Sequence, residues 1–229
     1  MNRAERYAHA RPGVVSFAVI DGRGRLHATR PRHGWYSASL LKPILLGAYL
    51  RQRSVRSRAL TTGERRLLAP MIQASADDPA SRLVIELGPA RVQAFGRRLG
   101  LNSLRVVLPT WGSTTITAAG YARFFRALPD TIPDRHRPYA RYLLGHIVRS
   151  QRWGIDRSRP RGWKMLSKSG WRAGRGYGRI VNQAARLECG DRVVSAAILT
   201  DRHPSHDTAT QTIAGVARRL LAPLGRCRA

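Results

Sequence analysis

Segments with the pattern of β-strands stand at both ends of this 229-residue chain, and its middle has the pattern of helices. Five stretches gather alternating or β-branched apolar residues between turn signals: residues 12–21, 26–29, 163–169, 178–188 and 192–200. The last two are joined by Cys189-Gly190-Asp191, a favourable hairpin turn. We therefore expect an α/β fold in which both chain ends build one antiparallel sheet of about five strands, packed with helices.

Apolar residues at helical spacing predict helices in the rest of the chain: residues 42–51, 61–74, 79–87, 89–99, 117–128, 137–149 and 207–221. Two of these helices open with a proline and close with a glycine, which is the usual punctuation of a helix. We expect a sheet lobe of residues 1–45 and 159–229, an all-helical lobe of residues 46–158, and an active site between them.

Lysine is rare here, which makes the position of each lysine informative. Lysine and arginine together number 41, and only Lys42, Lys164 and Lys168 are lysines, which leaves 38 arginines. Arginine stays protonated in proteins, whereas a buried lysine can lose its proton and act as a base. Coding bias toward arginine would explain the 38 arginines, but it would not explain where Lys42 and Lys168 stand.

Ser39 and Lys42 form a Ser-x-x-Lys motif inside an apolar run. Three residues apart at a helix N-terminus, the two side chains share one face. A desolvated lysine there can take the proton of the serine, and the free N–H groups of the helix start can bind an oxyanion. The alternative is a capping serine followed by a solvated lysine, which the apolar surroundings of Lys42 disfavour.

Two further polar motifs follow in the order that such a site requires. In Ser75-Ala76-Asp77, Ser75 could relay a proton; alternatively, Ser75 or Asp77 simply caps the next helix. Lys168-Ser169-Gly170 is expected to end a strand, where lysine and serine can bind a substrate carboxylate and glycine allows close approach. The alternative for this motif is an ordinary exposed strand end.

Together the three motifs resemble those of the class A β-lactamase-like serine hydrolases of the β-lactamase and penicillin-binding superfamily. The likeness covers most of the chain: residues 36–43 resemble the nucleophile segment and residues 71–80 the second motif. The stretch 114–118 resembles the helix start after the Ω loop of that family. Residues 151–155 with 168–172 look like the actinobacterial-type members. The resemblance implies a β-lactamase/transpeptidase-like fold.

The resemblance also implies roles for individual residues. Ser39 would be the nucleophile, Lys42 its base and Ser75 a proton shuttle. Substrate would be bound by Asp77, Lys168, Ser169, Gly170 and Trp171. Within that set Lys168 and Ser169 would hold a carboxylate, and the backbone N–H groups of Ser39 and Trp171 would form the oxyanion hole.

The sequence departs from the family pattern at two points. Asp77 stands where the family has asparagine, and a carboxylate beside Lys42 favours the charged, less basic form of the lysine. The Ω loop is reduced to residues 107–113 and contains no glutamate, although the family uses a glutamate there to activate the deacylating water. We therefore expect acylation machinery with doubtful deacylation.

The formal net charge of +28 predicts attraction to polyanions. The arginines are scattered, and no nucleic-acid-binding motif accompanies them, so we expect no specific nucleic acid partner and consider an anionic cell-wall polymer instead. Residues 1–6 lack the apolar stretch of a signal peptide, and no segment is apolar enough to span a bilayer. The location is expected to be extracytoplasmic, with a cytoplasmic one as the alternative.

The chain has two cysteines, Cys189 and Cys227, and no Cys-x-x-Cys motif. With the histidines dispersed, we expect no metal site and no cofactor. A helix over 207–221 that packs back across the sheet would return its end to the turn at Cys189, so we predict a disulfide between the two cysteines. Such a bond would argue for an oxidising compartment.

Three functions follow, in order of support. The first is a serine hydrolase that forms an acyl-enzyme on Ser39 from a β-lactam or related amide. The second is a D,D-peptidase that acts on peptidoglycan stem peptides through the same serine. The third is a non-catalytic protein that keeps the fold and binds the cell wall through its charge.

Overall fold

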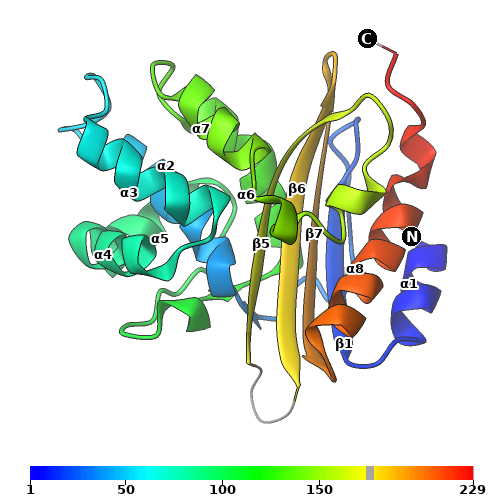
Figure 1. Ribbon diagram of the computed structural model, residues 1–229. Coiled ribbons are helices and arrows are strands. Elements are labelled where there is room, and N and C mark those ends of the chain that lie inside the picture. The colour runs from blue at the N-terminus through cyan, green and yellow to red at the C-terminus, as the bar shows by residue number, and fades with distance from the viewer. Residues whose placement is uncertain (174–177, 229) are drawn as a thin grey trace.

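A computed structural model describes residues 1–173 and 178–228, and Figure 1 shows a central sheet with helices on both faces. The antiparallel sheet has the strand order β2-β1-β7-β6-β5. Its strands are β1 (Val14–Ile20), β2 (Leu26–Ala28), β5 (Lys164–Ala173), β6 (Arg179–Cys189) and β7 (Arg192–His203). Because β1 pairs directly with β7, both chain ends build one sheet, and the expected fold is confirmed.

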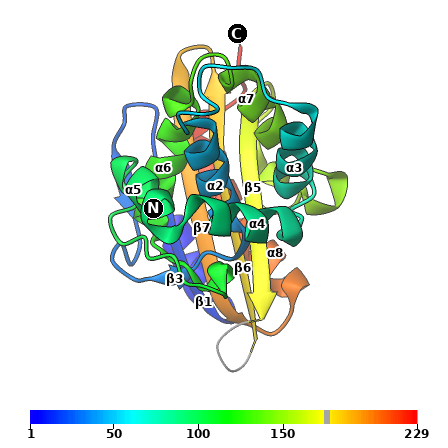
Figure 2. The same ribbon diagram turned by 90° about the vertical axis from the view of Figure 1, so that its left-hand side faces the viewer.

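Helices cover the two faces of the sheet unequally. One face carries α1 (Asn2–His9) and α8 (His206–Leu221), which pack on each other. Figures 1 and 2 show the other face under a larger helical layer, with α2 between α3 and α5. That layer contains α2 (Leu41–Leu50), α3 (Thr62–Gln73), α4 (Asp77–Leu87), α5 (Pro89–Arg98), α6 (Ala118–Thr131) and α7 (Arg137–Gly145).

Alternation along β1 explains why the sheet needs both layers. Phe17 and Val19 point into the core under α1 and α8, whereas Ala18 and Ile20 belong to the core under the larger helical layer. Successive side chains of a strand face opposite sides, so a strand that is apolar at every position must be buried on both faces. Among the described helices, none is long and apolar enough to cross a membrane.

Several boundaries differ from those expected from the sequence. The pattern gave no indication of α1, nor of the short pair β3 (Trp35–Tyr36) and β4 (Thr115–Ile116). Helix α7 ends at Gly145 instead of residue 149, because glycine is followed by β-branched Ile147 and Val148, and the Val148 N–H bonds the Gln73 carbonyl.

The predicted disulfide is present. Cys189, at the turn between β6 and β7, is bonded to Cys227, and their Cα atoms lie 5.7 Å apart. The bond fastens the segment after α8 to the hairpin, as expected from a helix that packs back across the sheet. Figure 1 shows that both chain termini lie on the side of the sheet that carries α1 and α8.

Candidate active site

Ser39 lies in a tight turn that positions it at the start of α2. A single 3₁₀ turn, Ala38–Leu40, runs directly into α2, and Ser39 is nearly buried within it. Ala38 has φ of +46°, a left-handed conformation that non-glycine residues rarely adopt and that recurs at functional sites. The Tyr121 hydroxyl donates to the Leu40 carbonyl at 2.5 Å and fixes this turn from α6.

Lys42 is fully buried one helical turn further on, and its ammonium group is surrounded by polar atoms. Nζ lies 3.0 Å from Ser39 Oγ, 3.2 Å from Ser75 Oγ and 2.6 Å from Asp77 Oδ1, and it also donates to the Ser75 carbonyl. Four contacts exceed the three N–H bonds of an ammonium group. A neutral amine would instead donate to Asp77 and to the carbonyl, and would accept the hydrogen of Ser39.

The pKa of Lys42 is lowered from its ordinary value because burial penalises the charged amine, while the neighbouring carboxylate of Asp77 opposes this effect. Asp77 itself is largely exposed, with 72% of its side chain accessible, so solvent weakens its hold on the amine. The ring of Trp111 lies 5.2 Å from Nζ and closes the site on another side.

Ser75 stands between the two buried lysines. It lies in the loop between α3 and α4 with φ of +59°, again a left-handed non-glycine residue. The N-cap of α4 is Ala76, which offers no capping side chain, so neither Ser75 nor Asp77 serves as the cap considered from the sequence. Ser75 Oγ is therefore free to accept hydrogen bonds from Lys42 Nζ at 3.2 Å and from Lys168 Nζ at 2.7 Å.

The Lys168-Ser169-Gly170 motif lies in the middle of β5, and the expectation that it ends a strand is wrong. The strand continues to Ala173 because pairing with β6 continues, with Trp171 opposite Val181. β5 is the edge of the sheet, and a Cβ on Gly170 would lie only 2.7 Å from the Ser39 amide nitrogen. Glycine therefore lets the strand press against the nucleophile turn.

Lys168 is completely buried and holds its amine against Ser75 Oγ and the Ser169 carbonyl, at 2.7 and 2.8 Å. Burial lowers its pKa well below the ordinary value, and the positive charge of Lys42 adds to the effect. Two cationic groups beside one hydroxyl repel each other, so the pair of lysines favours a total charge below +2.

Three supporting residues were not found from the sequence. Gln183 on β6 donates to Ser169 Oγ at 3.1 Å and to the half-buried carboxyl of Asp156 at 2.9 Å. Gln151 donates to the Ala74 carbonyl at 2.8 Å and so braces the Ser75 loop. The available signal was Asn182-Gln183 in an otherwise apolar strand, because buried amides require partners.

Trp171 is 41% exposed and follows Gly170 on β5. The centroid of its ring lies 5.8 Å from that of His206 and 6.5 Å from that of Trp153, so the three rings form an aromatic cluster. The shortened loop 107–113 carries Trp111, which donates to Ser81 Oγ at 2.9 Å. Among the described residues, Asp77 is the acidic residue that forms an ion pair with Lys42.

The model of a family described as the β-lactamase enzyme family (Beta-lactamase2) matches residues 2–224, which is nearly the whole chain. The chain belongs to this family. It is therefore a serine hydrolase of the β-lactamase family, which confirms the family drawn from the three motifs but not the actinobacterial type. No curated protein sequence matches the chain.

Solved structures support the same fold for the enzyme. An ancestral (GNCA) class A β-lactamase has 22% identity and a TM-score of 0.80, over 97% of this chain and 98% of that one. A β-lactamase from Sphaerobacter thermophilus has 18% identity and a TM-score of 0.84, over 97% of each chain. One from Xanthomonas campestris pv. campestris has 17% and 0.83, over 98% and 97%. At such identities the likeness speaks for the fold alone.

Proposed function

We propose that this enzyme forms an acyl-enzyme on Ser39 from a β-lactam or a related amide. One observation carries the proposal: Ser39, Lys42, Ser75 and Lys168 form an unbroken chain of contacts of 3.0, 3.2 and 2.7 Å. Each link is within reach of a proton transfer, and burial lowers the pKa of both lysines. An ordinary surface serine and lysine would share neither property.

The proposed first step is attack on the substrate carbonyl carbon. Ser39 Oγ forms the new C–O bond while its proton passes to the neutral amine of Lys42. The backbone N–H groups of Ser39 and Trp171 would receive the oxyanion, which the close approach of Gly170 to the Ser39 amide supports. When the C–N bond breaks, the proton moves from Lys42 through the Ser75 hydroxyl to the leaving nitrogen, so the charges balance.

Substrate binding would rest on the second lysine. Lys168 and Ser169 would bind a carboxylate of the substrate, because an ionised carboxylate accepts charge-assisted hydrogen bonds from an amine and a positioned hydroxyl. In support, Ser169 is oriented by Gln183, and no acidic side chain bonds Lys168 in the residues the structure covers. Asp77 and the exposed ring of Trp171 would contact the rest of the substrate.

Deacylation would be slow. The hydrolytic half of the reaction needs a base beside the ester carbonyl, and loop 107–113 supplies an indole and hydroxyl groups instead of a carboxylate. The same shortage supports a second candidate, a D,D-peptidase that acts on peptidoglycan stem peptides and hands its acyl group to another acceptor. The sequence likeness of residues 151–155 and 168–172 to actinobacterial-type members is compatible with either substrate.

An extracytoplasmic location fits this chemistry. The Cys189–Cys227 disulfide is typical of oxidising compartments. There the net charge of +28 would draw the enzyme to anionic wall polymers, close to peptidoglycan. Neither a metal nor a cofactor enters the proposed steps.

Labelling with a fluorescent penicillin tests the proposal. The intact protein should gain one adduct by mass spectrometry, Ser39→Ala should gain none, and Ser37→Ala, two residues away, should retain labelling. An adduct that persists in Ser39→Ala would refute the assignment. No adduct on the native chain with any β-lactam, acyl-fluorophosphonate or D-Ala-D-Ala thioester would favour the non-catalytic wall-binding protein.

A further inference from the structure

A concave site lies at the end of α2 opposite to Ser39 and Lys42. It is a cavity of about 650 Å³ between the end of α2, the segment that follows it, and α5. Five of its lining residues are arginines: Arg51, Arg53, Arg56, Arg91 and Arg98. Since α2 has ten residues, this arginine pocket lies roughly 15 Å from the Ser39 end of the helix, and it shares no lining residue with the active site.

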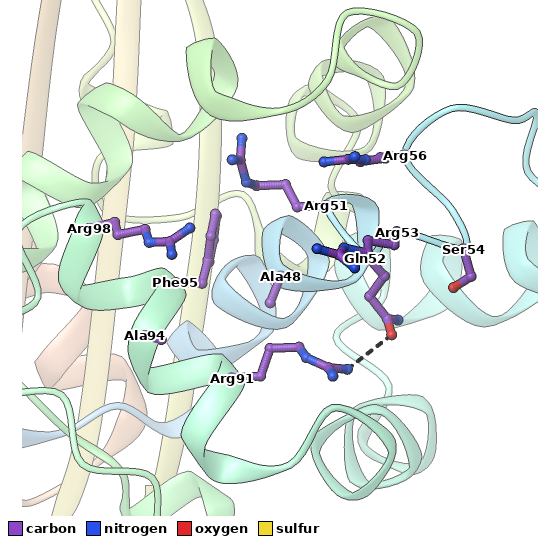
Figure 3. A pocket seen from close by; sticks show the side chains of 10 residues that line it. All are labelled: Ala48, Arg51, Gln52, Arg53, Ser54, Arg56, Arg91, Ala94, Phe95 and Arg98. Carbon is purple, nitrogen blue, oxygen red and sulfur yellow. Dashed lines mark hydrogen bonds between the residues drawn. The ribbon is translucent and has the colours of Figure 1, made fainter.

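Figure 3 shows the arginine side chains around Ala48 and Phe95, and the third apolar lining residue is Ala94. Arg51 donates to the Thr131 carbonyl at 2.6 Å, and Arg91 donates to Gln52 Oε1 at 3.2 Å. Both partners are neutral. In the part of the chain that the structure describes, none of the five guanidinium groups is paired with a carboxylate, and no acidic residue lines the cavity.

Helix dipoles explain only part of this cluster. Arg51 follows the last residue of α2, and Arg98 ends α5, where a cation complements the negative helix end. Arg91, however, is the third residue of α5, at the positive end of that helix, where its charge is unfavourable. Dipole compensation therefore does not account for the convergence of these charges on one cavity.

A concave wall of like charges is costly unless an anion neutralises it, because the charges repel and the cavity focuses their field. Guanidinium forks match phosphate oxygens in pairs, with two parallel hydrogen bonds for each fork. The volume falls within the roughly 300–1,000 Å³ typical of small-ligand sites. Several forks suit a compact anion with more than one phosphate group.

We propose that the arginine pocket is a binding site for an anion that carries two or more phosphate groups. Such groups come from a free oligophosphate or from the phosphodiester backbone of an anionic wall polymer, and the chemistry recognised is the same. The site stands apart from the proposed acylation of Ser39, because its residues touch neither the nucleophile nor the two buried lysines.

Isothermal titration of the full chain with inorganic tripolyphosphate tests this proposal. Arg53→Gln/Arg98→Gln should raise Kd roughly tenfold or more, since charge-assisted hydrogen bonds are lost. The matched control Arg66→Gln/Arg218→Gln removes the same charge from α3 and α8 and should leave Kd nearly unchanged. Arg53→Lys/Arg98→Lys should also weaken binding, because lysine keeps the charge but lacks the fork.

A second arm separates the sources of the phosphate. Competition by a short glycerol-phosphate oligomer would assign a wall polymer, and its failure would assign a free oligophosphate. Equal loss of binding in the pocket variant and the control would reduce the effect to net charge and overturn the proposal, as would absence of tripolyphosphate binding. Melting curves and Ser39 labelling of every variant should match the native chain, which separates this test from that of the proposed function.

Discussion

Lys168 Nζ lies 2.7 Å from Ser75 Oγ, although the two residues are 93 positions apart in the sequence. This contact joins β5 to the loop between α3 and α4 and completes the path that begins at Ser39. It also brings the buried amine of Lys168 near that of Lys42, whose positive charge adds to the effect of burial in lowering the pKa of Lys168.

Lys42→Arg should damage acylation nearly as much as Lys42→Ala. Arginine keeps the charge but cannot accept the proton of Ser39, and a positioned base is worth roughly 10²-fold or more. The rate of labelling by a fluorescent penicillin measures the effect. Lys164→Arg, at the exposed start of β5, is the matched control and should label normally. Near-normal labelling of Lys42→Arg would remove Lys42 from the role of base.

Asp77→Asn should move the pH dependence of acylation toward lower pH. The carboxylate raises the pKa of Lys42, so its removal lets the amine lose its proton at a lower pH. The rising limb of the pH–rate profile, measured by stopped-flow between about pH 5 and 10, should shift in that direction. A limb that stays in place would mean that another group titrates.

Hydrolysis of a chromogenic cephalosporin should begin with a burst. Acylation of Ser39 should release about one equivalent of product, followed by slow turnover, because loop 107–113 offers no carboxylate to activate water. Stopped-flow absorbance measures both phases. Fast steady turnover without a burst would contradict the prediction and would direct attention to Asp77, which Asp77→Asn would then test.

Stability should depend on pH through Asp156. Burial raises the pKa of this carboxyl from 3.8 to about 6, so the folded chain keeps a proton that the unfolded chain loses. The free energy of unfolding therefore falls as pH rises from about 4 to about 6, by an amount on the order of 2 kcal/mol. Asp156→Asn should lack this decline. Parallel urea curves for both proteins across that range would contradict the prediction.

Loss of the disulfide should lower the free energy of unfolding. The cysteines enclose a loop of 38 residues, and the chain-entropy model assigns about 4 kcal/mol to such a loop. Denaturant unfolding of Cys189→Ser/Cys227→Ser, compared with the native chain with and without reductant, measures the change. An unchanged midpoint would show that packing of α8 alone holds the chain end.

The sequence predicted local relations in the site well. Ser39 and Lys42 are neighbours because three residues make almost one helical turn, and the disulfide followed from the lengths of β7 and α8. The sheet was readable because β1 and β7 are apolar on both faces. The two-lobe division and the roles of the site residues stay predictions.

Other features depend on tertiary packing that no local pattern encodes. Ser75 could be assigned to the site only through the family resemblance, because its short motif also suited a helix cap. Trp111 and Gln183 act through contacts across the molecule, at 30 and 14 positions of separation. Helix α1 escaped notice because its buried residues are Ala4 and Ala8, whose small side chains give a weak periodic signal.

The position of the two termini has a practical consequence. Both ends lie on the α1 and α8 side of the sheet, whereas Ser39 opens α2 on the other side (Figure 1). A fluorophore, an affinity tag or a surface linker joined to either end would thus lie on the opposite side of the sheet from Ser39. Immobilised protein should label with penicillin as readily as free protein, which makes single-molecule observation of the acylation step feasible.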